Sequence, residues 1–517
     1  MKRRIVTYLM LVCVLAQVAT AQEPVDQQII SRIKTEAFQN SQAMETVSYL
    51  SDVYGARLSG SPSLKAASEW ARDRMKQWGL ENAQLEPWGT FGPGWSLNKF
   101  SAEMVEPQYV NLIAYPRAWS PSTDGVVSGK PVLVEVKSKA DFDKYRGKLK
   151  GAIVMNGKPA PSPPSFKPEA TRLTEEELAA KAQAINPGEP KSYLEEEEEW
   201  LKSLAQQNEI IKFFHDEGIA LMIEPSARDY AIVRVSGFYN RNPQETYPAV
   251  VMAKEHYGRI ARMLEKNVPV KLEFNLRTTF HTEDPTGYNV IAEIPGSDPR
   301  LKDEVVMLGG HIDSWHAATG ATDNAAGCAV MMEAARILKA IGARPRRTIR
   351  VALWSGEEQD YYGSLGYVKK HFGDPETLAL KPEHAKLSAY FNLDNGTGKI
   401  RGINIQGNEA VRPIFEAYLK PFHYLGATTV TTLNTGGTDH MPFDAVGLPG
   451  FQFIQDPIAY NTRTHHTNVD TVEHVIEDDL KISSAIVAAI AYHTAMRDEK
   501  LPREALPKPK AKANAAK

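Results

Sequence analysis

The stretch VVMLGGHID, residues 305–313, decides the fold and points to the chemistry of this chain. It begins as a short apolar run rich in β-branched residues, which is typical of a buried strand. The run ends directly on His311 and Asp313, two residue types that bind metal ions in proteins. Residues two apart in extended backbone face the same side, so we expect the Asp313 carboxylate to accept the second ring N–H of His311.

Two other apolar runs end on carboxylates in the same way. Residues 348–353 lead into Glu357 and Glu358, and residues 389–393 lead into Asp394. Strand-like runs alternate with helical patterns throughout this part of the chain, which predicts an α/β domain with a mixed, largely parallel central sheet flanked by helices. Ligands of such sheets bind beyond the carboxyl ends of the strands, where these side chains lie. The further strand-like runs are 289–294 and 451–454, and the helical patterns include 324–338 and 411–419.

Composition places the chain among ordinary globular proteins. It has 517 residues, of which 42% are hydrophobic and 24% charged, and its net charge is −3. These values exclude a disordered chain, a fibre and a multi-span membrane protein, and the charge balance argues against a nucleic-acid partner. The two cysteines, Cys13 and Cys328, rule out a disulfide framework.

Residues 1–21 have the three-part pattern of a secretory signal peptide. A basic start is followed by an apolar segment, and the small residues Ala19-Thr20-Ala21 predict cleavage before Gln22. The alternative is an uncleaved anchor, although the apolar segment is just short of a spanning length. We therefore expect an exported protein, periplasmic or secreted, with no membrane span after cleavage.

The mature chain divides into an interrupted catalytic domain, an insert and a tail. The catalytic domain is expected over residues 22–120 and 281–500, with an early helix that Gly79 ends. Residues 121–280 contain short β-rich runs and form a β-rich insert, whose acidic run 195–199 is expected on a solvated helix face. Residues 501–517 are rich in Pro, Ala and Lys, and predict a disordered basic tail.

The nature of the candidate ligands predicts a hydrolytic metal site. Imidazoles and carboxylates without a thiolate suit zinc, with cobalt or manganese as alternatives. Glu357 and Glu358 are neighbours and cannot both point at one atom from a regular strand. On a bending loop, one of them can bind metal while the other reaches the water that attacks the substrate, which separates a ligand from a general base.

Several motifs together resemble those of the M28 co-catalytic zinc exopeptidases. The resemblance covers about residues 30–110 and 280–495, and the segment between them resembles a protease-associated domain. Taken singly the motifs are weak, but their order and spacing are specific. They are GHIDS (310–314), TDNAAG (322–327), SGEE (355–358), NLD (392–394) and His466 four residues before Asp470-Thr471, together with GARLSGS (55–61).

The resemblance implies a zinc-exopeptidase fold and two Zn²⁺ ions. Asp323 would bridge the two metals, His311 and Asp394 would complete one site, and Glu358 and His466 would complete the other. Glu357 would be the general base that activates a metal-bridging water, with Asp313 as a second catalytic residue. His466 is preferred to His465 on spacing alone. No other cofactor is expected.

The substrate pocket is less marked in the sequence. Asp360, Tyr361 and Tyr362 replace the glycine that the family often has two residues after Glu-Glu, which bears on substrate preference. Thr438-Asp439-His440 stands where relatives often have Ser-Asp-His, and His440 either lines the pocket or supports a loop. Tyr361, His440 and Tyr460 are the candidate substrate-binding residues.

The function implied by the resemblance is that of an aminopeptidase acting on the N-terminus of peptides. The alternative within the same chemistry is a carboxypeptidase or dipeptidase of the carboxypeptidase Q type. A receptor-like binding protein on the same fold is disfavoured, because the chain keeps all five ligands and Glu357. Peptides are the expected partners, and a homodimer is compatible with the sequence.

Overall fold

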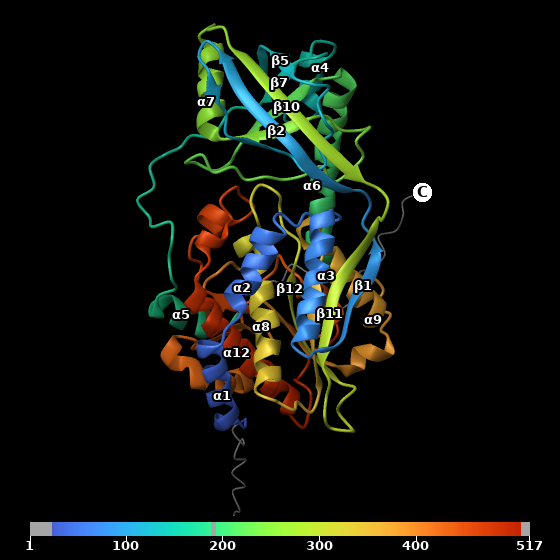
Figure 1. The fold of residues 1–517 in the computed structure, drawn as a ribbon, viewed down its shortest axis with the longest axis vertical. Coiled ribbons are helices and arrows are strands. Elements are labelled where there is room, and N and C mark those ends of the chain that lie inside the picture. The colour runs from blue at the N-terminus through green and yellow to red at the C-terminus, as the bar shows by residue number, and fades with distance from the viewer. Residues whose placement is uncertain (1–22, 188–192, 508–517) are drawn as a thin grey trace, which may run out of the picture.

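The computed structural model describes residues 23–187 and 193–507, which form two bodies placed end to end (Figure 1). The larger body, residues 23–93 and 282–507, is called the sheet domain, and the smaller, residues 94–281, the inserted lobe. The expected signal peptide lies outside the described residues. Within the described ranges, no helix is long and apolar enough to cross a membrane.

The sheet domain is built on an eight-stranded mixed sheet. Its centre is parallel: β12 pairs with β13 and with β14, and β14 pairs with β17. Antiparallel pairs β1–β11, β11–β13 and β15–β17 make the sheet mixed, so the predicted fold class is confirmed. In spatial order the strands are β1 (Glu81–Thr90), β11 (Thr286–Ile294), β13 (Thr348–Trp354), β12 (Val305–His311), β14 (Leu387–Asn392), β17 (Gly450–Gln455), β15 (Ile400–Asn404) and β16 (Thr429–Thr431).

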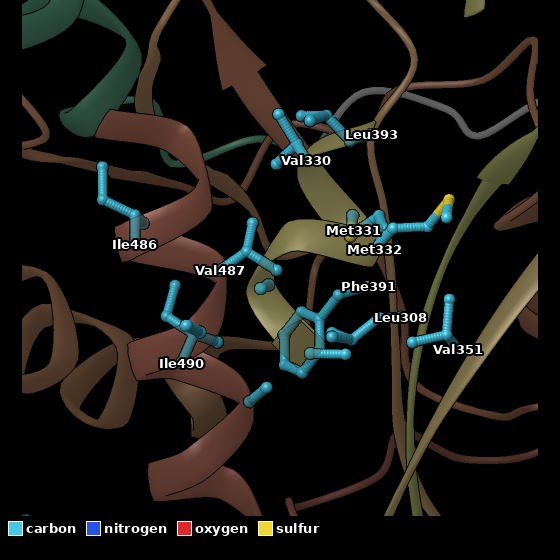
Figure 2. Packing of buried hydrophobic residues seen from close by; sticks show 14 of the residues in the cluster. Leu308, Val330, Met331, Met332, Val351, Phe391, Leu393, Ile486, Val487 and Ile490 are labelled. Carbon is cyan, nitrogen blue, oxygen red and sulfur yellow. The ribbon is translucent and has the colours of Figure 1, made fainter. Parts of the chain in front are cut away.

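Helices cover both faces of this sheet, and the strand side chains alternate between them. Leu308 of β12 joins the core that α8 and α12 cover, whereas Met307 joins the opposite core beside α9. Figure 2 shows the first of these cores, where Phe391 of β14 lies among side chains of α8 and α12. The helices are α1 (Gln27–Gln39), α2 (Ala43–Ser48), α3 (Pro62–Gln77), α8 (Ala326–Ala340), α9 (Tyr362–His371), α10 (Arg412–Leu419), α11 (Met441–Asp444) and α12 (Glu477–Met496).

The inserted lobe contains two smaller sheets. A long antiparallel ribbon of β2 and β10 carries β3 and β5 at its edges, and a five-stranded sheet has the order β4-β9-β8-β7-β6. Strands β2 to β4 precede residue 121, and the boundary expected there stays a prediction, as does the protease-associated character of the lobe. The elements are β2 (Gly94–Glu106), β3 (Val110–Asn111), β4 (Ala114–Pro116), β5 (Val127–Gly129), β6 (Pro131–Val134), α4 (Phe142–Tyr145), β7 (Ile153–Asn156), α6 (Tyr193–Glu217), β8 (Leu221–Pro225), β9 (Ala249–Met252), α7 (Lys254–Glu265) and β10 (Lys271–His281).

One segment of the inserted lobe leaves it and lies on the sheet domain. Helix α5 (Glu175–Ala182) packs beside β16, far from the rest of the lobe (Figure 1). Just before it, Thr171 bridges to Ile458, and Arg172 forms ion pairs with Asp456 at 2.8 Å and Asp479 at 2.7 Å. The two bodies are therefore tied together away from their covalent connections.

The beginning of the expected tail also packs on the sheet domain. Leu501 is buried and its N–H donates to Ser388 Oγ. Arg503 donates to the carbonyls of His384 and Leu387. Residues 501–507 are thus held in place by a buried apolar side chain and by hydrogen bonds, contrary to the disorder expected for them; residues 508–517 lie outside the described ranges.

A buried arginine connects the N-terminal segment to the loops that follow β12. The Arg57 side chain is inaccessible to solvent, and its guanidinium donates to the carbonyls of Ile312 (2.7 Å), Thr319 (2.7 Å) and Gly320 (2.8 Å). It also donates to Leu50 in the preceding helical segment. Because a guanidinium offers five N–H donors in a rigid fork, one side chain can hold several backbone segments at once.

We expect Arg57→Met to lower the thermal unfolding midpoint by roughly 6–12 °C, because several buried carbonyls lose their donors at a cost of about 3 kcal/mol or more. Differential scanning calorimetry measures the shift. Arg72→Met is the matched control, since Arg72 pairs at the surface with its neighbour Asp73. Equal midpoints for the Arg57 variant and the wild type would contradict the structural role of Arg57.

Candidate metal centre

Three parallel strands deliver their polar side chains to one edge of the sheet. His311 is the last residue of β12, Glu357 follows β13 and Asp394 follows β14. The ligand atoms of these three side chains lie within 4.8 Å of one another, and His311 Nε2 is 3.2 Å from Asp394 Oδ1. The shared direction of the strands places the side chains together, as the sequence predicts.

Asp323 lies between two histidines and turns one carboxylate oxygen to each. Its Oδ1 is 3.2 Å from His311 Nε2, and its Oδ2 is 3.3 Å from His466 Nε2. Asp323 lies in the segment Ala321–Ala325, whose backbone is non-helical at Asp323 and Asn324 and which leads into α8. A carboxylate with this placement can bind one metal ion through each oxygen.

Glu358 completes the second group of ligand atoms. Its Oε2 is 2.9 Å from His466 Nε2, and its atoms also lie within 4.8 Å of those of His311 and Asp323. His465 is more distant, with Nε2 4.0 Å from Asp323 Oδ2, although it too belongs to a group with Asp323 and His466. The structure thus brings together all five expected ligands and Glu357; their individual roles stay predictions.

The Asp313 carboxylate does not accept a hydrogen bond from the His311 ring, contrary to the expectation from the sequence. His311 Nδ1 is 3.1 Å from the backbone carbonyl of Asp313 but 3.7 Å from its carboxylate, which is too far for a hydrogen bond. The Asp313 carboxylate instead accepts from Ser59 Oγ and from the backbone N–H groups of Glu357 and Glu358, the last two at 3.3 Å. It therefore positions the Glu357-Glu358 loop, while the backbone next to it orients His311.

Asp470, the acidic residue that follows His466 in the motif, holds the Asp323 turn. Its two oxygens accept from the backbone N–H groups of Thr322 at 2.6 Å and Asp323 at 3.1 Å. Burial, together with the charge of Asp323, raises the pKa of Asp470 to about 7. The fixed spacing between His466 and Asp470 therefore places a ligand and a support for the bridging carboxylate in one loop.

The pKa shifts of His311, Glu357 and Glu358 reflect the negative charge that these buried side chains share. Burial opposes the charged form of His311, but the charges of Asp394 and Glu357 outweigh it and raise the pKa of this imidazole well above its usual value. Burial raises the pKa of Glu357 and of Glu358, and neighbouring carboxylates add to the effect. A cation at the centre of the cluster would lower the pKa of both glutamates again.

The three candidate substrate-binding residues lie at different depths. Tyr460 is buried and packs against the His465 ring at a centroid distance of 4.8 Å. Tyr361 lies close enough to Glu357 for that charge to raise its pKa further than burial alone does. His440 is fully buried and its Nε2 is 2.9 Å from the carbonyl oxygen of Thr435, an arrangement that supports a loop. A pocket role for all three stays a prediction.

Two residues of the inserted lobe, Arg234 and Tyr239, lie near the candidate metal ligands, and the sequence did not predict this. Arg234 Nη2 lies 3.4 Å from His466 Nδ1. Burial raises the pKa of Tyr239 to about 12, and the charge of Glu358 contributes. No motif or strand pattern could have identified either residue, because only the docking of the lobe brings it near residues more than 100 positions away in sequence.

Comparison with known proteins agrees with this geometry. Residues 289–491 match peptidase family M28. The chain is 27% identical to carboxypeptidase Q of Mus musculus over 486 residues, which covers 93% of this chain and 91% of that protein.

Two solved structures share the fold. A peptidase M28 precursor from Shewanella amazonensis has a TM-score of 0.68 at 24% identity and covers 93% of this chain and 99% of its own. A zinc aminopeptidase from Bacillus subtilis has a TM-score of 0.55 at 19% identity, with 87% and 93% covered. The matched residues 289–491 hold all five expected ligands and Glu357, so the similarity to peptidase family M28 extends over the whole candidate metal centre.

Proposed function

We propose that the chain is an exported di-zinc exopeptidase that hydrolyses the terminal peptide bond of short peptides. The observation that carries this proposal is the placement of Asp323 between His311 and His466, with one oxygen toward each. The resemblance to the zinc aminopeptidase from Bacillus subtilis supports zinc as the metal. Export rests on the signal-peptide pattern of residues 1–21.

The donor set fits two divalent ions. Asp323 Oδ2 and Glu358 Oε1 are buried and accept no hydrogen bond from any described residue, as expected of oxygens reserved for a cation. His311, Asp323 and Asp394 would hold one ion, and Asp323, Glu358 and His466 the other. Zinc supplies Lewis acidity, which polarises a peptide carbonyl and makes a water molecule more acidic.

Glu357 is the residue that moves the proton. It is 8% exposed, its backbone N–H donates to Asp313 Oδ1, and its carboxylate points into the group formed with His311 and Asp394. In this position it takes a proton from the attacking water and returns it to the leaving amine. Asp313 fixes the loop so that Glu358 and Glu357, although adjacent, serve as ligand and base.

This function includes two alternative specificities, that of an aminopeptidase and that of a carboxypeptidase or dipeptidase. The motifs favour an aminopeptidase, and solved aminopeptidases of the same fold support this specificity. The carboxypeptidase or dipeptidase alternative is supported by the match to carboxypeptidase Q, which runs through the inserted lobe as well as the sheet domain. A receptor-like role is disfavoured, because the full set of ligands is assembled.

We expect Glu357→Gln to lower kcat by about 10²–10⁴-fold while zinc binding stays near normal, because the amide cannot accept the proton but the ligands are intact. Turnover of a dipeptide and zinc content by elemental analysis measure the two effects. Glu358→Gln is the matched neighbour and should lose zinc as well as activity. Near-normal turnover of the Glu357 variant would refute its assignment as the base.

We expect the zinc-loaded protein to hydrolyse a dipeptide with both termini free, because every exopeptidase specificity considered for this site accepts it. The panel consists of the free dipeptide, its N-acetyl derivative, its C-terminal amide and the doubly blocked form, with product amines measured. Loss of cleavage on acetylation identifies a requirement for the free amine, and loss on amidation a requirement for the carboxylate. Efficient cleavage of the doubly blocked form would contradict an exopeptidase.

A further inference from the structure

The loop that carries Glu357 and Glu358, residues 355–362, is called the glutamate loop, and its backbone is unfavourable after the two glutamates. Asp360 (φ 98°) and Tyr361 (φ 56°) both lie in the left-handed region, which residues other than glycine rarely adopt. Backbone in this region persists only where the surrounding structure holds it. The conformation of the glutamate loop therefore depends on contacts with residues outside it.

Residues of the sheet domain hold both ends of the glutamate loop. At its start, the Ser355 N–H donates to Asn289 Oδ1 at 3.2 Å, and Ser355 Oγ accepts from Trp88 Nε1 at 2.9 Å. At its end, the ring of Tyr362 stacks on the ring of Trp88, with the centroids 5.8 Å apart and the planes 10° from parallel. A single indole therefore contacts the first and the last residue of the loop.

Arg241 of the inserted lobe lies against the same aromatic cluster. Its guanidinium carbon is 4.0 Å from the ring centroid of Phe91 and 5.7 Å from those of Trp119 and Tyr362. The Phe91 ring in turn meets the rings of Trp88 and Tyr362 edge to face, at centroid distances of 6.4 and 6.1 Å. Arg241 thus connects the lobe to the rings that hold the end of the glutamate loop.

Aromatic faces, rather than carboxylates, compensate the charge of Arg241. Its Nη1 is buried and has no hydrogen-bond acceptor among the described residues, and within the same ranges its guanidinium forms no ion pair. Burial lowers the pKa of Arg241, and the phenol of Tyr362 acts in the opposite direction. A guanidinium over a ring face is attracted by the ring quadrupole, most strongly where water is excluded. The position of Arg241 and the positions of the rings therefore support each other.

The lobe presents Arg241 from a hydrogen-bonded turn. The Arg241 N–H donates to the Phe238 carbonyl at 3.1 Å, and the Asn242 N–H donates to Asn240 Oδ1 at 2.8 Å. The side chain of Asn240 donates to Glu245, whose N–H donates to the Asn242 carbonyl. The turn is fixed by these local bonds, so the guanidinium is placed on the rings by the lobe and not by the glutamate loop.

We propose that Arg241 is a positioning residue for the general base: it holds the ring of Tyr362 and thereby keeps the glutamate loop in the conformation that directs Glu357 at the attacking water. The inference rests on the proposed function and deepens it. Arg241 acts through Tyr362 and does not contact the reacting atoms. The Asp313 carboxylate supports the same loop from the sheet domain through the N–H groups of Glu357 and Glu358. The glutamate loop is then fixed by both bodies of the molecule.

The kinetic test uses the zinc-loaded full chain and a dipeptide with free termini. We expect Arg241→Met to lower kcat about 10-fold or more while KM stays near the wild-type value, because a misplacement of about 1 Å costs a reaction about 10²-fold. Arg241→Lys should lie between, because it keeps the cation but loses the planar guanidinium. Arg146→Met is the matched control, since Arg146 lies at the lobe surface and pairs with Asp143. An unchanged kcat for Arg241→Met, or a raised KM at unchanged kcat, would overturn the inference.

A double variant tests whether Arg241 acts through Tyr362. Tyr362→Leu should lower kcat as Arg241→Met does, and the double variant should be no slower than the slower single variant, because both changes break the same contact. Losses of kcat that multiply in the double variant would show that the two residues act independently, and would contradict the proposed role of Arg241.

Hydrogen exchange tests the contact without catalysis. In the glutamate loop the N–H groups of Asp360 and Tyr361 donate to the Glu357 carbonyl, and that of Tyr362 donates to the Gly356 carbonyl. Arg241→Met should speed the exchange of these three N–H groups about 10-fold or more, because local opening becomes easier, while Arg146→Met leaves it unchanged. Exchange equal to that of the wild type would overturn the inference. A wild type that cleaves no peptide would instead refute the proposed function, and the exchange comparison would still decide whether Arg241 holds the loop.

Discussion

Seven carboxylates converge at one buried edge of the sheet, and the repulsion among them is the constraint on which the rest of the site depends. Like charges in a water-poor environment cannot all remain ionised unless cations compensate them. Arg57 supplies one permanent positive charge nearby, but its fork is occupied by backbone carbonyls. The carboxylates are those of Asp313, Asp323, Asp394, Asp439, Asp470, Glu357 and Glu358.

The pKa directions show how the chain shares this negative charge without a metal. Burial opposes the ionised form of Asp323, but a hydrogen bond to His311 and the charges of His466, His311 and His465 outweigh it and lower the pKa of Asp323. The pKa values of Glu357 and Glu358 are raised, and Asp439 reaches about 8 through burial. His311 acts as the positive centre in this arrangement. Two divalent ions would replace that proton, ionise the glutamates and release Glu357 for proton transfer, so the ligand set and the general base depend on the same charge balance.

Much of this centre could be predicted from the sequence because its parts lie at the ends of parallel strands. The runs before His311, Glu357 and Asp394 form β12, β13 and β14, and their direction alone brings the three side chains together. His466 and Asp323 do not follow strands of the sheet, and the motif spacing identified them. Local sequence could not show that the Asp313 carbonyl, rather than its carboxylate, meets His311, because a small rotation of the backbone decides which oxygen is nearer.

The position of Arg234, a residue of the inserted lobe beside His466 of the sheet domain, could not be predicted from the sequence for a different reason. Arg234 has no neighbouring motif, and its position depends on the pairing of residues 233–235 with 466–468. The lobe is also tied down elsewhere: Arg172, which lies just before α5, forms ion pairs with Asp456 and Asp479, and both of these carboxylates are buried in the sheet domain. Arg401 holds the same Asp456 from the other side. Removing one partner of such a network leaves buried charge uncompensated, so the lobe is held at a fixed distance from the metal centre.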